Sequence, residues 1–366
     1  MKKTLVILNM SQGGAETFLM KLFRKVDKNK LIFDFIFTTD TKQFYEDEII
    51  KLGGRIYRIN SKSYKLLTRH KEVKEIVRKN KYDTVFVASQ NSVGALSLYA
   101  AKKGGANKLV FRSTNTKASG KISTILLHYL FRPFANRLSN IKLAPSTEAA
   151  KHMFGKRYPM DKVKLVNNGI DTNLFEFNEE SRVKIRKQLN VSDEFLIGHV
   201  GRFAKQKNHK YLIKVFNEVL KVKPNAKLLL IGKGPLKETG IRQAKSLGIY
   251  ENIIIKEGIT NMQEYYMAMD MLVFPSFYEG LPNVVVEAQA TGLPCLISNT
   301  ISKEVVLTDL VNMLSIKVDP VNWAKKIDDF NVKNREGYAD ILKEKGYDIE
   351  DVLNVFLKTI MGENND

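Results

Sequence analysis

Short apolar runs alternate with amphipathic stretches along most of this 366-residue chain. The runs have the length of buried strands, and the stretches between them repeat apolar positions at helical spacing. We expect strands at Thr4–Asn9, Phe33–Thr38, Arg55–Ile59, Thr84–Ala88, Lys108–Arg112, Ile141–Pro145, Phe195–Val200, Lys227–Ile231, Ile253–Lys256, Met271–Pro275 and Pro294–Ser298. We expect helices at Ala15–Val26, Tyr45–Leu52, Ser92–Lys103, Thr147–Phe154, Tyr211–Val222, Leu236–Leu247, Met262–Ala268 and Asn283–Thr291. This α/β alternation predicts parallel sheets with helices on both faces.

The cycle of strands and helices pauses once, over residues 167–190, where the sequence is polar and has no strand pattern. The chain is also too long for one ordinary core. We therefore expect two doubly wound, Rossmann-like domains that face each other across a cleft. The first would span residues 1–168 and the second residues 169–345. Residues 346–366 would form a helix that packs back on the first domain.

Two carboxylates eight residues apart, Glu279 and Glu287, lie across an expected strand-to-helix junction. Glu279 follows a buried strand, at the edge where open α/β sheets bind ligands. Pro282 suits the first turn of the next helix, whose free N–H groups offer an anion site between the carboxylates. Carboxylates that accept from hydroxyls, beside amides that hold phosphate, suit a nucleotide sugar. Two solvated surface glutamates would produce the same pattern.

A second loop, also between a strand and a helix, carries two cations. It begins at Gly201-Arg202 and reaches Lys207. Arg and Lys neutralise a diphosphate, the first as a planar fork and the second as a point charge. The loop therefore indicates a phosphate site, although a basic surface loop is the alternative.

Two further glycine turns follow expected strands. Gly232-Lys233-Gly234 would allow a ligand close to the backbone, as would an ordinary tight turn. Gly13-Gly14 precedes the first helix and forms an anion cradle at its N-terminus. The sequence there is neither G-x-G-x-x-G nor a Walker motif, so a dinucleotide or an ATP phosphate receives little support.

The positive charge of the chain lies entirely in its first half. Residues 1–168 carry 33 Lys and Arg against 12 Asp and Glu, whereas residues 169–366 carry 26 against 27. Such a field indicates an anionic partner. The basic stretches Lys62–Lys81 and Lys121–Arg137 have apolar residues at helical spacing, which is typical of helices on anionic lipid. The alternative is that the apolar residues pack into the core. No nucleic-acid motif accompanies the charge, so nucleic acid is not an expected partner.

Nothing in the sequence indicates export or a membrane span. Lys2-Lys3 precede only a short apolar run, and no stretch approaches the roughly 20 apolar residues that cross a bilayer. One cysteine, Cys295, permits no internal disulfide and is compatible with a reducing compartment. We therefore expect a cytoplasmic protein, peripherally associated with the inner face of the cell membrane through its basic first domain.

With these motifs the chain resembles the family-4 glycosyltransferases, retaining enzymes with the GT-B fold, especially those that build bacterial capsule, exopolysaccharide or lipopolysaccharide. Five motifs in one consistent order between residues 13 and 294 carry the resemblance. They are Gly13-Gly14-Ala15-Glu16, Asn168-Gly169-Ile170-Asp171, Gly201-Arg202 with Lys207, Gly232-Lys233-Gly234-Pro235-Leu236, and Pro275-Ser276 through Glu279 and Glu287 to Gly292-Leu293-Pro294. These motifs are specific for fold and reaction class and not for the sugar.

The resemblance implies roles for individual residues. Arg202 and Lys207 would hold the donor diphosphate, Glu279 the hydroxyls of the donor sugar, and Glu287 the ribose. The remaining donor-binding residues that it implies are Gly13, Gly14, Gly232, Lys233, Gly234, Gly258, Ile259, Gly280, Leu281, Asn283, Val284 and Val285. It implies no metal and no other cofactor, and the chain has no Asp-x-Asp pair.

The chain departs from the family pattern at one loop. Many relatives have a histidine near the reacting sugar in the loop after the strand at 108–112. Here that loop reads Arg112-Ser113-Thr114-Asn115-Thr116. Either Arg112 or Asn115 takes over a positioning role on the acceptor side, or the acceptor is arranged differently.

The sequence thus predicts a retaining, metal-independent glycosyltransferase of cell-surface polysaccharide synthesis. It would move a hexose or N-acetylhexosamine from a nucleotide diphosphate sugar, expected to be UDP-linked, to a lipid-linked saccharide such as a polyprenyl diphosphate glycan. Two alternatives stay open. One is a sugar-nucleotide epimerase or hydrolase of the same fold, and the other is a non-catalytic partner subunit of a transferase.

Overall fold

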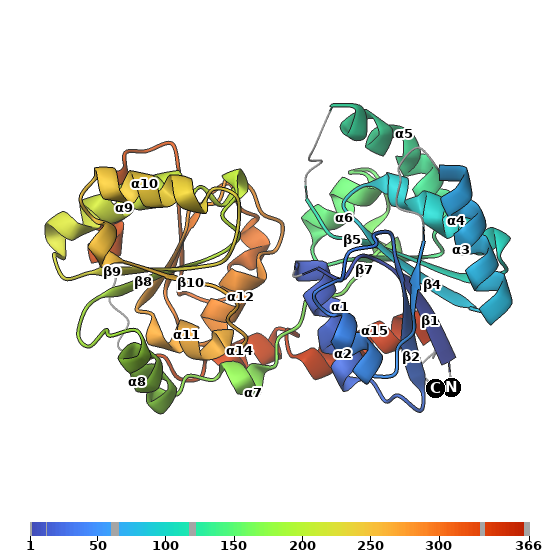
Figure 1. Ribbon diagram of the computed structural model, residues 1–366, viewed down its shortest axis with the longest axis horizontal. Helices are drawn as coiled ribbons and strands as arrows, with labels where there is room; N and C mark the ends of the chain where they lie inside the picture. Colours follow the sequence, from blue (N-terminus) through green and yellow to red (C-terminus); the bar gives the residue numbers. More distant parts are fainter. Residues whose placement is uncertain (1, 12, 60–65, 117–121, 330–333, 362–366) are drawn as a thin grey trace. The chain divides into compact units, whose positions relative to one another are not determined.

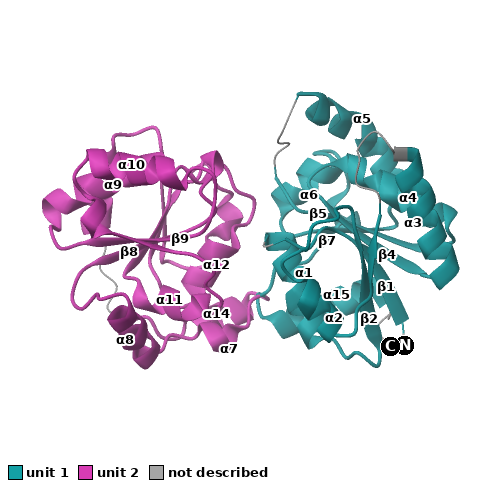
Figure 2. Cartoon of the chain, viewed as in Figure 1, with its two compact units in different colours: residues 1–169, 347–366 teal, residues 170–346 magenta. Residues whose placement is uncertain are grey.

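The computed structural model describes residues 2–11, 13–59, 66–116, 122–329 and 334–361 of the chain. The chain divides into two compact units, which Figure 2 shows in different colours. Unit 1 comprises residues 1–169 together with 347–366, and unit 2 comprises residues 170–346. Both divisions lie one residue later than the boundaries expected from the sequence.

Unit 1 is built on a parallel sheet (Figure 1). The sheet has seven strands in the order β3-β2-β1-β4-β5-β6-β7. Its strands are β1 (Lys2–Ile7), β2 (Leu31–Phe37), β3 (Ile56–Arg58), β4 (Thr84–Ser89), β5 (Lys108–Ser113), β6 (Ile141–Ala144) and β7 (Lys164–Leu165). Its α-helices are α1 (Gly14–Lys25), α2 (Glu46–Lys51), α3 (Leu66–Asn80), α4 (Ala95–Lys103), α5 (Ile122–Leu138), α6 (Thr147–Phe154) and α15 (Ile349–Met361).

The sheet of unit 1 is covered on both faces, so its strands are long apolar runs rather than alternating ones. Every residue of β2 is buried. On one face, α1 and α15 pack together, and the Phe356 ring lies 6.0, 6.2 and 5.9 Å from the rings of Phe18, Phe33 and Phe86. Helices α3, α4, α5 and α6 contribute to the core on the other face. The last helix of the chain therefore belongs to the core of unit 1.

Unit 2 repeats the architecture with a six-stranded parallel sheet in the order β10-β9-β8-β11-β12-β13. Its strands are β8 (Leu196–Val200), β9 (Lys227–Ile231), β10 (Ile253–Lys256), β11 (Met271–Phe274), β12 (Cys295–Ser298) and β13 (Val311–Leu314). Its α-helices are α7 (Thr172–Phe175), α8 (Glu179–Gln188), α9 (His209–Val222), α10 (Lys237–Ser246), α11 (Met262–Ala268), α12 (Asn283–Ala290), α13 (Pro320–Asp328) and α14 (Tyr338–Glu344). Helices α9, α10 and α13 supply the core on one face of this sheet.

The expected strands and helices are all present, with ends shifted by a few residues. The edge strands β7 and β13, which have two and four residues, are not predicted by the pattern of the sequence. None of their residues is fully buried, so they lack the apolar run that marks an interior strand. The pattern also predicts no helix in the polar segment that contains α8.

The two basic helices differ in what they bury. In α3, Val73 and Val77 lie in the core, so the alternative of core packing holds there. In α5, Ile122, Leu126 and Leu130 are 86%, 68% and 69% exposed, so core packing does not account for that helix. Three of the lysines counted in these stretches, Lys62, Lys65 and Lys121, lie outside the described residues. No helix within the described ranges is long and apolar enough to cross a membrane.

Candidate active site

The candidate donor residues of unit 2 follow four neighbouring strands. Strands β10, β9, β8 and β11 lie side by side in that order and run parallel, so the loops after them gather at one edge of the sheet. The strand order reverses between β8 and β11, and ligands bind open α/β sheets at such a reversal. The loop after β8 carries Arg202 and Lys207, and the loop after β11 carries Glu279. The topology thus brings the loops that carry the two cations and the first carboxylate to the same edge of the sheet.

Backbone and amide hydrogen bonds join these two loops. The amide of Asn208 donates to the Pro275 carbonyl at 3.1 Å, and the Phe277 N–H donates to the Gln206 carbonyl at 2.9 Å. The Gln206 amide in turn donates to the Tyr278 carbonyl at 2.9 Å. Asn208 adopts a left-handed backbone, with φ of 55°, and directly precedes α9. These contacts hold the cationic loop against the carboxylate loop.

Lys207 and Glu279 form an ion pair in which Nζ and Oε1 are 2.8 Å apart. The Lys207 and Glu279 side chains are only 16% and 12% exposed. The ion pair does not have the alignment of a hydrogen bond. The Lys207 ammonium also lies 4.4 Å from the ring centroid of Phe274, a favourable cation–π distance. A Cβ on Gly201 would approach the lysine stem to 2.9 Å, so the glycine gives that stem room. Arg202, by contrast, is exposed.

The glycines of the loop after β9 are required by the protein itself. Gly232 and Gly234 have φ of 151° and 156°. A Cβ on Gly232 would lie 2.2 Å from the carbonyl oxygen of Gly201, and a Cβ on Gly234 would lie 2.5 Å from that of Phe203. The Phe203 N–H donates to the Lys233 carbonyl at 2.8 Å, so the loops after β8 and β9 pack backbone to backbone. These glycines therefore let the neighbouring loop pack closely, which is a structural reason for the motif alongside the expected approach of a ligand.

Helix α12 begins at Asn283, and Pro282 lies just before it rather than in its first turn. The side chain of Leu281 is buried, and the first amides of the helix, those of residues 283–285, are at the ligand edge of the sheet. Glu287 lies on the second turn, where its Oε2 accepts a hydrogen bond of 3.1 Å from the hydroxyl of Tyr266. At the loop after β10, Gly258 is exposed, with φ of 70°.

Two buried histidines lie beneath the cationic loop. The rings of His199 and His209 are 4.7 Å apart, and His209 stacks on Phe203 at 4.2 Å. Burial, with the nearby charge of Lys207, lowers the pKa of His209 to about 4, and burial also lowers the pKa of His199. His199 lies in β8, where the sequence predicted a strand residue. Both imidazoles are therefore neutral at physiological pH.

In unit 1, the expected anion cradle contains a carboxylate of the protein. A Cβ on Gly13 would lie 2.5 Å from Glu16 Oε2, and the Ser11 hydroxyl donates to Glu16 Oε1 at 2.7 Å. Burial raises the pKa of the Glu16 carboxyl. The Glu16 carboxylate thus folds back over the start of α1, beside Gly13.

The acceptor-side candidates Arg112 and Asn115 lie at the end of β5 and just after it. Arg112 is 1% exposed and donates to Val166 O at 3.1 Å and to Asn168 Oδ1 at 2.7 Å. Burial lowers its pKa to about 9. A side chain in this position reaches an acceptor only indirectly, by holding the segment that leaves unit 1. Asn115 is half-buried, and its Oδ1 accepts from the Thr116 N–H at 2.9 Å.

The structure adds three residues that the sequence analysis did not connect with the site. They are Gln206, Phe274 and Tyr266, which contact the expected site residues from their loops, strand and helix. Phe274 and Tyr266 lie in apolar runs and have the pattern of core residues. No sequence signal marks them, because their role depends on which strands and helices are adjacent.

Comparison with known proteins agrees with this architecture. The crystal structure of HepE from Anabaena, in complex with UDP, has a TM-score of 0.80 at 16% identity, over 99% of this chain and 100% of that one. This likeness and the two parallel α/β units confirm the GT-B fold. A model described as Glycosyltransferase Family 4 matches residues 12–174, and one described as Glycosyl transferases group 1 matches residues 181–348.

Curated relatives identify the family. EpsF of Bacillus subtilis (strain 168), named as a glycosyltransferase, is 32% identical over 96% of this chain and 95% of its own length. The UDP-Gal:alpha-D-GlcNAc-diphosphoundecaprenol alpha-1,3-galactosyltransferase of Escherichia coli is 26% identical over 62% of this chain and 60% of its own length. The chain belongs to the family-4 glycosyltransferases, and it is therefore an enzyme of glycosyl transfer.

Proposed function

We propose that the protein is a retaining, metal-independent glycosyltransferase of cell-surface polysaccharide synthesis. It moves a hexose or N-acetylhexosamine from a UDP-linked donor to a lipid-linked saccharide. The observation that carries this proposal is the clustering of Lys207 and Glu279 at the strand-order reversal of unit 2, with Arg202 on the same loop as the lysine. A site with cations for a diphosphate and a carboxylate for sugar hydroxyls fits a nucleotide sugar.

Each group of residues has a distinct task in this proposal. Arg202 and Lys207 bind the donor diphosphate and stabilise it as it leaves. Glu279 accepts hydrogen bonds from hydroxyls of the donor sugar, and Glu287 accepts from those of the ribose. Backbone groups of residues 283–285 bind the phosphates, and those of Gly232, Lys233, Gly258 and Ile259 receive the base. The UDP complex of HepE supports a uridine nucleotide as the donor.

Two fixed cations supply the charge stabilisation that a metal ion supplies elsewhere. Lys207 is held by its ion pair with Glu279 and its contact with the Phe274 ring, so it needs little reorganisation when negative charge develops on the leaving diphosphate. Retention follows when the acceptor hydroxyl attacks the same face of the sugar that the diphosphate leaves. The leaving phosphate oxygen then accepts the proton of that hydroxyl, and no protein base is required.

The acceptor is proposed to be a lipid-linked glycan that unit 1 meets at an anionic membrane surface. The E. coli relative is named for a diphosphoundecaprenol-linked sugar. Helix α5 presents an exposed stripe of Ile122, Leu126, Tyr129 and Leu130. No acidic residue occurs between Asp83 and Glu148, a span that includes α4, α5 and several lysines and arginines. Apolar side chains within a cationic region suit an anionic bilayer, so we assign the protein to the cytoplasmic face of the membrane.

The test is transfer from UDP-sugars to polyprenyl diphosphate glycans in vesicles, with release of UDP and the product anomer both measured. We expect activity with one UDP-sugar, the same anomeric configuration in donor and product, and undiminished rates in excess EDTA. Glu287→Ala should abolish transfer. Inversion, or loss of activity in EDTA that added Mg²⁺ restores, would contradict the mechanism. UDP release that does not depend on any acceptor would instead favour a hydrolase.

A further inference from the structure

The hydroxyl of Tyr266 is hydrogen-bonded to the candidate ribose ligand Glu287. Tyr266 is completely buried in α11, and its hydroxyl donates to Glu287 Oε2 at 3.1 Å. Burial, with the adjacent Glu287 carboxylate, raises the pKa of this phenol well above its ordinary value. The phenol therefore remains protonated and remains a donor to the carboxylate at all physiological pH values.

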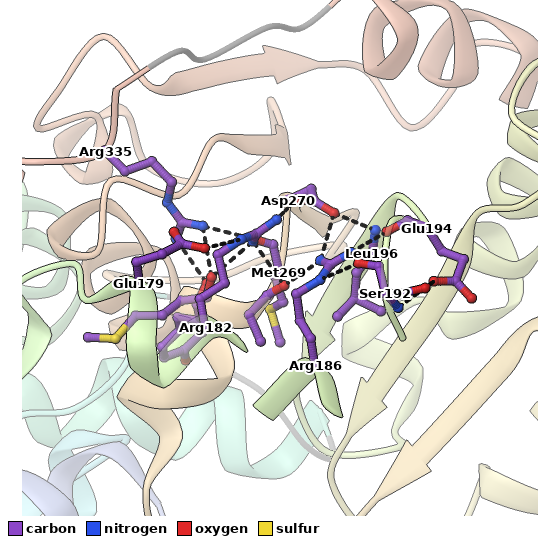
Figure 3. A network of polar contacts seen from close by, with 12 residues as sticks. Glu179, Arg182, Arg186, Ser192, Glu194, Leu196, Met269, Asp270 and Arg335 are labelled. Carbon is purple, nitrogen blue, oxygen red and sulfur yellow. Dashed lines mark hydrogen bonds and ion pairs between the residues drawn. The ribbon is translucent and has the colours of Figure 1, made fainter. Parts of the chain in front are cut away.

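The helix that carries Tyr266 is anchored by a network of arginines (Figure 3). Arg335 donates to the carbonyls of Tyr266, Met267 and Met269 at 3.0, 3.0 and 2.8 Å. Arg182 donates to the Met267 and Met269 carbonyls, both at 3.1 Å, and pairs with Asp270 at 2.6 Å. The last carbonyls of a helix lack partners within it, and here the guanidinium groups satisfy them.

This network fixes the position of the phenol ring. A tyrosine has only two side-chain torsions, so a ring that is fully buried on an anchored helix has little freedom. Its hydroxyl then holds one oxygen of the carboxylate on the neighbouring helix α12, and it restricts rotation of that carboxylate about its last bond. A preoriented acceptor binds a ligand hydroxyl with a smaller loss of entropy than a mobile one.

We propose that Tyr266 is a positioning residue that orients Glu287 toward the ribose hydroxyls of the donor nucleotide. The proposal rests on the role of Glu287 in the proposed function. It assigns Tyr266 no contact with the ligand, because the side chain is completely buried. It predicts that the hydroxyl matters only for ligands whose ribose can be read by Glu287.

The test measures binding of UDP and of 2′,3′-dideoxy-UDP to the full chain by calorimetry. Tyr266→Phe removes only the hydroxyl. Tyr265→Phe is the matched control, since Tyr265 is 7% exposed on the same helix and, among the described residues, its hydroxyl has no hydrogen-bond partner. We expect Tyr266→Phe to weaken UDP about tenfold, the equivalent of one ordinary hydrogen bond. Its affinity for the dideoxy nucleotide, which lacks both ribose hydroxyls, should change less than twofold, about the effect of Tyr265→Phe.

Binding by Glu287→Gln distinguishes a failure of the positioning role of Tyr266 from a failure of the proposed role of Glu287. If Glu287→Gln weakens UDP but Tyr266→Phe does not, the positioning role is overturned and the site stands. If Glu287→Gln affects neither nucleotide, the role of Glu287 itself fails. Equal weakening of both nucleotides by Tyr266→Phe would mean that the hydroxyl supports the fold of the unit and not the orientation of Glu287.

Discussion

Replacing Lys207 by methionine removes the ammonium from the candidate site and keeps an unbranched side chain of similar shape. The lysine stem fills the space that a Cβ on Gly201 would occupy, and its ammonium lies over the ring of Phe274. A methionine can occupy the same space, so the substitution isolates the effect of the charge. It also leaves Glu279 without its cation.

The structure sets the size of two separate effects. At 2.8 Å the Lys207–Glu279 attraction is about 6 kcal/mol for an effective dielectric constant of about 20, before desolvation. Both side chains are mostly withdrawn from water, so we expect a net loss of about 1–3 kcal/mol in unfolding free energy, between the values for exposed and buried pairs. The second effect is a loss of kcat. A fixed group that stabilises developing charge contributes about 10²–10³ in kcat.

The assay compares kcat for UDP release in the presence of acceptor with the urea unfolding free energy of each variant. Lys205→Met is the control, because Lys205 is an exposed lysine in the same turn of 3-10 helix. It should leave both quantities unchanged. Adding Glu279→Gln to Lys207→Met should recover part of the lost stability, since it removes the uncompensated carboxylate, and should recover none of the rate. A Lys207→Met enzyme that keeps kcat within threefold of the wild type would refute the assignment of the diphosphate site.

The pKa of His209 is about 4 in the folded protein, below the ordinary value of about 6.5. Between these two values the unfolded chain binds a proton at His209 that the folded protein does not bind. The unfolding free energy therefore falls as the pH drops below about 6.5. His209→Phe should therefore lose about 2 kcal/mol less unfolding free energy than the wild type between pH 7 and pH 5, and equal losses in urea titrations would exclude this origin. The double substitution Leu126→Lys and Leu130→Lys should weaken binding to anionic vesicles more than tenfold by loss of apolar burial, even though it adds positive charge. Val222→Lys, an exposed change in unit 2, should not weaken it, and tighter binding of the double variant in a flotation assay would show that charge alone attracts the protein. Gly232→Ala should destabilise unit 2 by about 1–3 kcal/mol because its Cβ would collide with the Gly201 carbonyl. Gly258→Ala is the control: a Cβ there meets nothing within 4 Å, so the variant should cost about 1 kcal/mol for its positive φ alone. Equal melting temperatures of the two variants would contradict this difference.

Much of the fold could be predicted from the local pattern, since a buried parallel strand is a short apolar run and an amphipathic helix repeats every 3.6 residues. The pattern failed for the edge strands β7 and β13, which are short and incompletely buried. It also failed to distinguish α3 from α5. Both helices combine basic and apolar residues, but only the neighbours in the folded unit decide which apolar residues become buried.

The candidate site shows the same division. The loops after β8 and β11 could be assigned to one edge, because every strand of a parallel sheet ends on the same side. That β8 and β11 are adjacent is not visible in their sequences. The pairing of Lys207 with Glu279, and of Tyr266 with Glu287, depends on that adjacency and on the packing of α11 against α12.

The sequence by itself determined the alternation of strands and helices, the division into two units and the family of the enzyme, because these depend on local periodicity and on short motifs. The tertiary structure alone decided which of the motif residues meet and which are buried. Arg112 became an interior residue that holds the exit from unit 1, and Gly232 a contact between two loops. The physical reason is that burial and pairing are properties of three-dimensional neighbours, and the order of strands in a sheet is not written in any one segment of the chain.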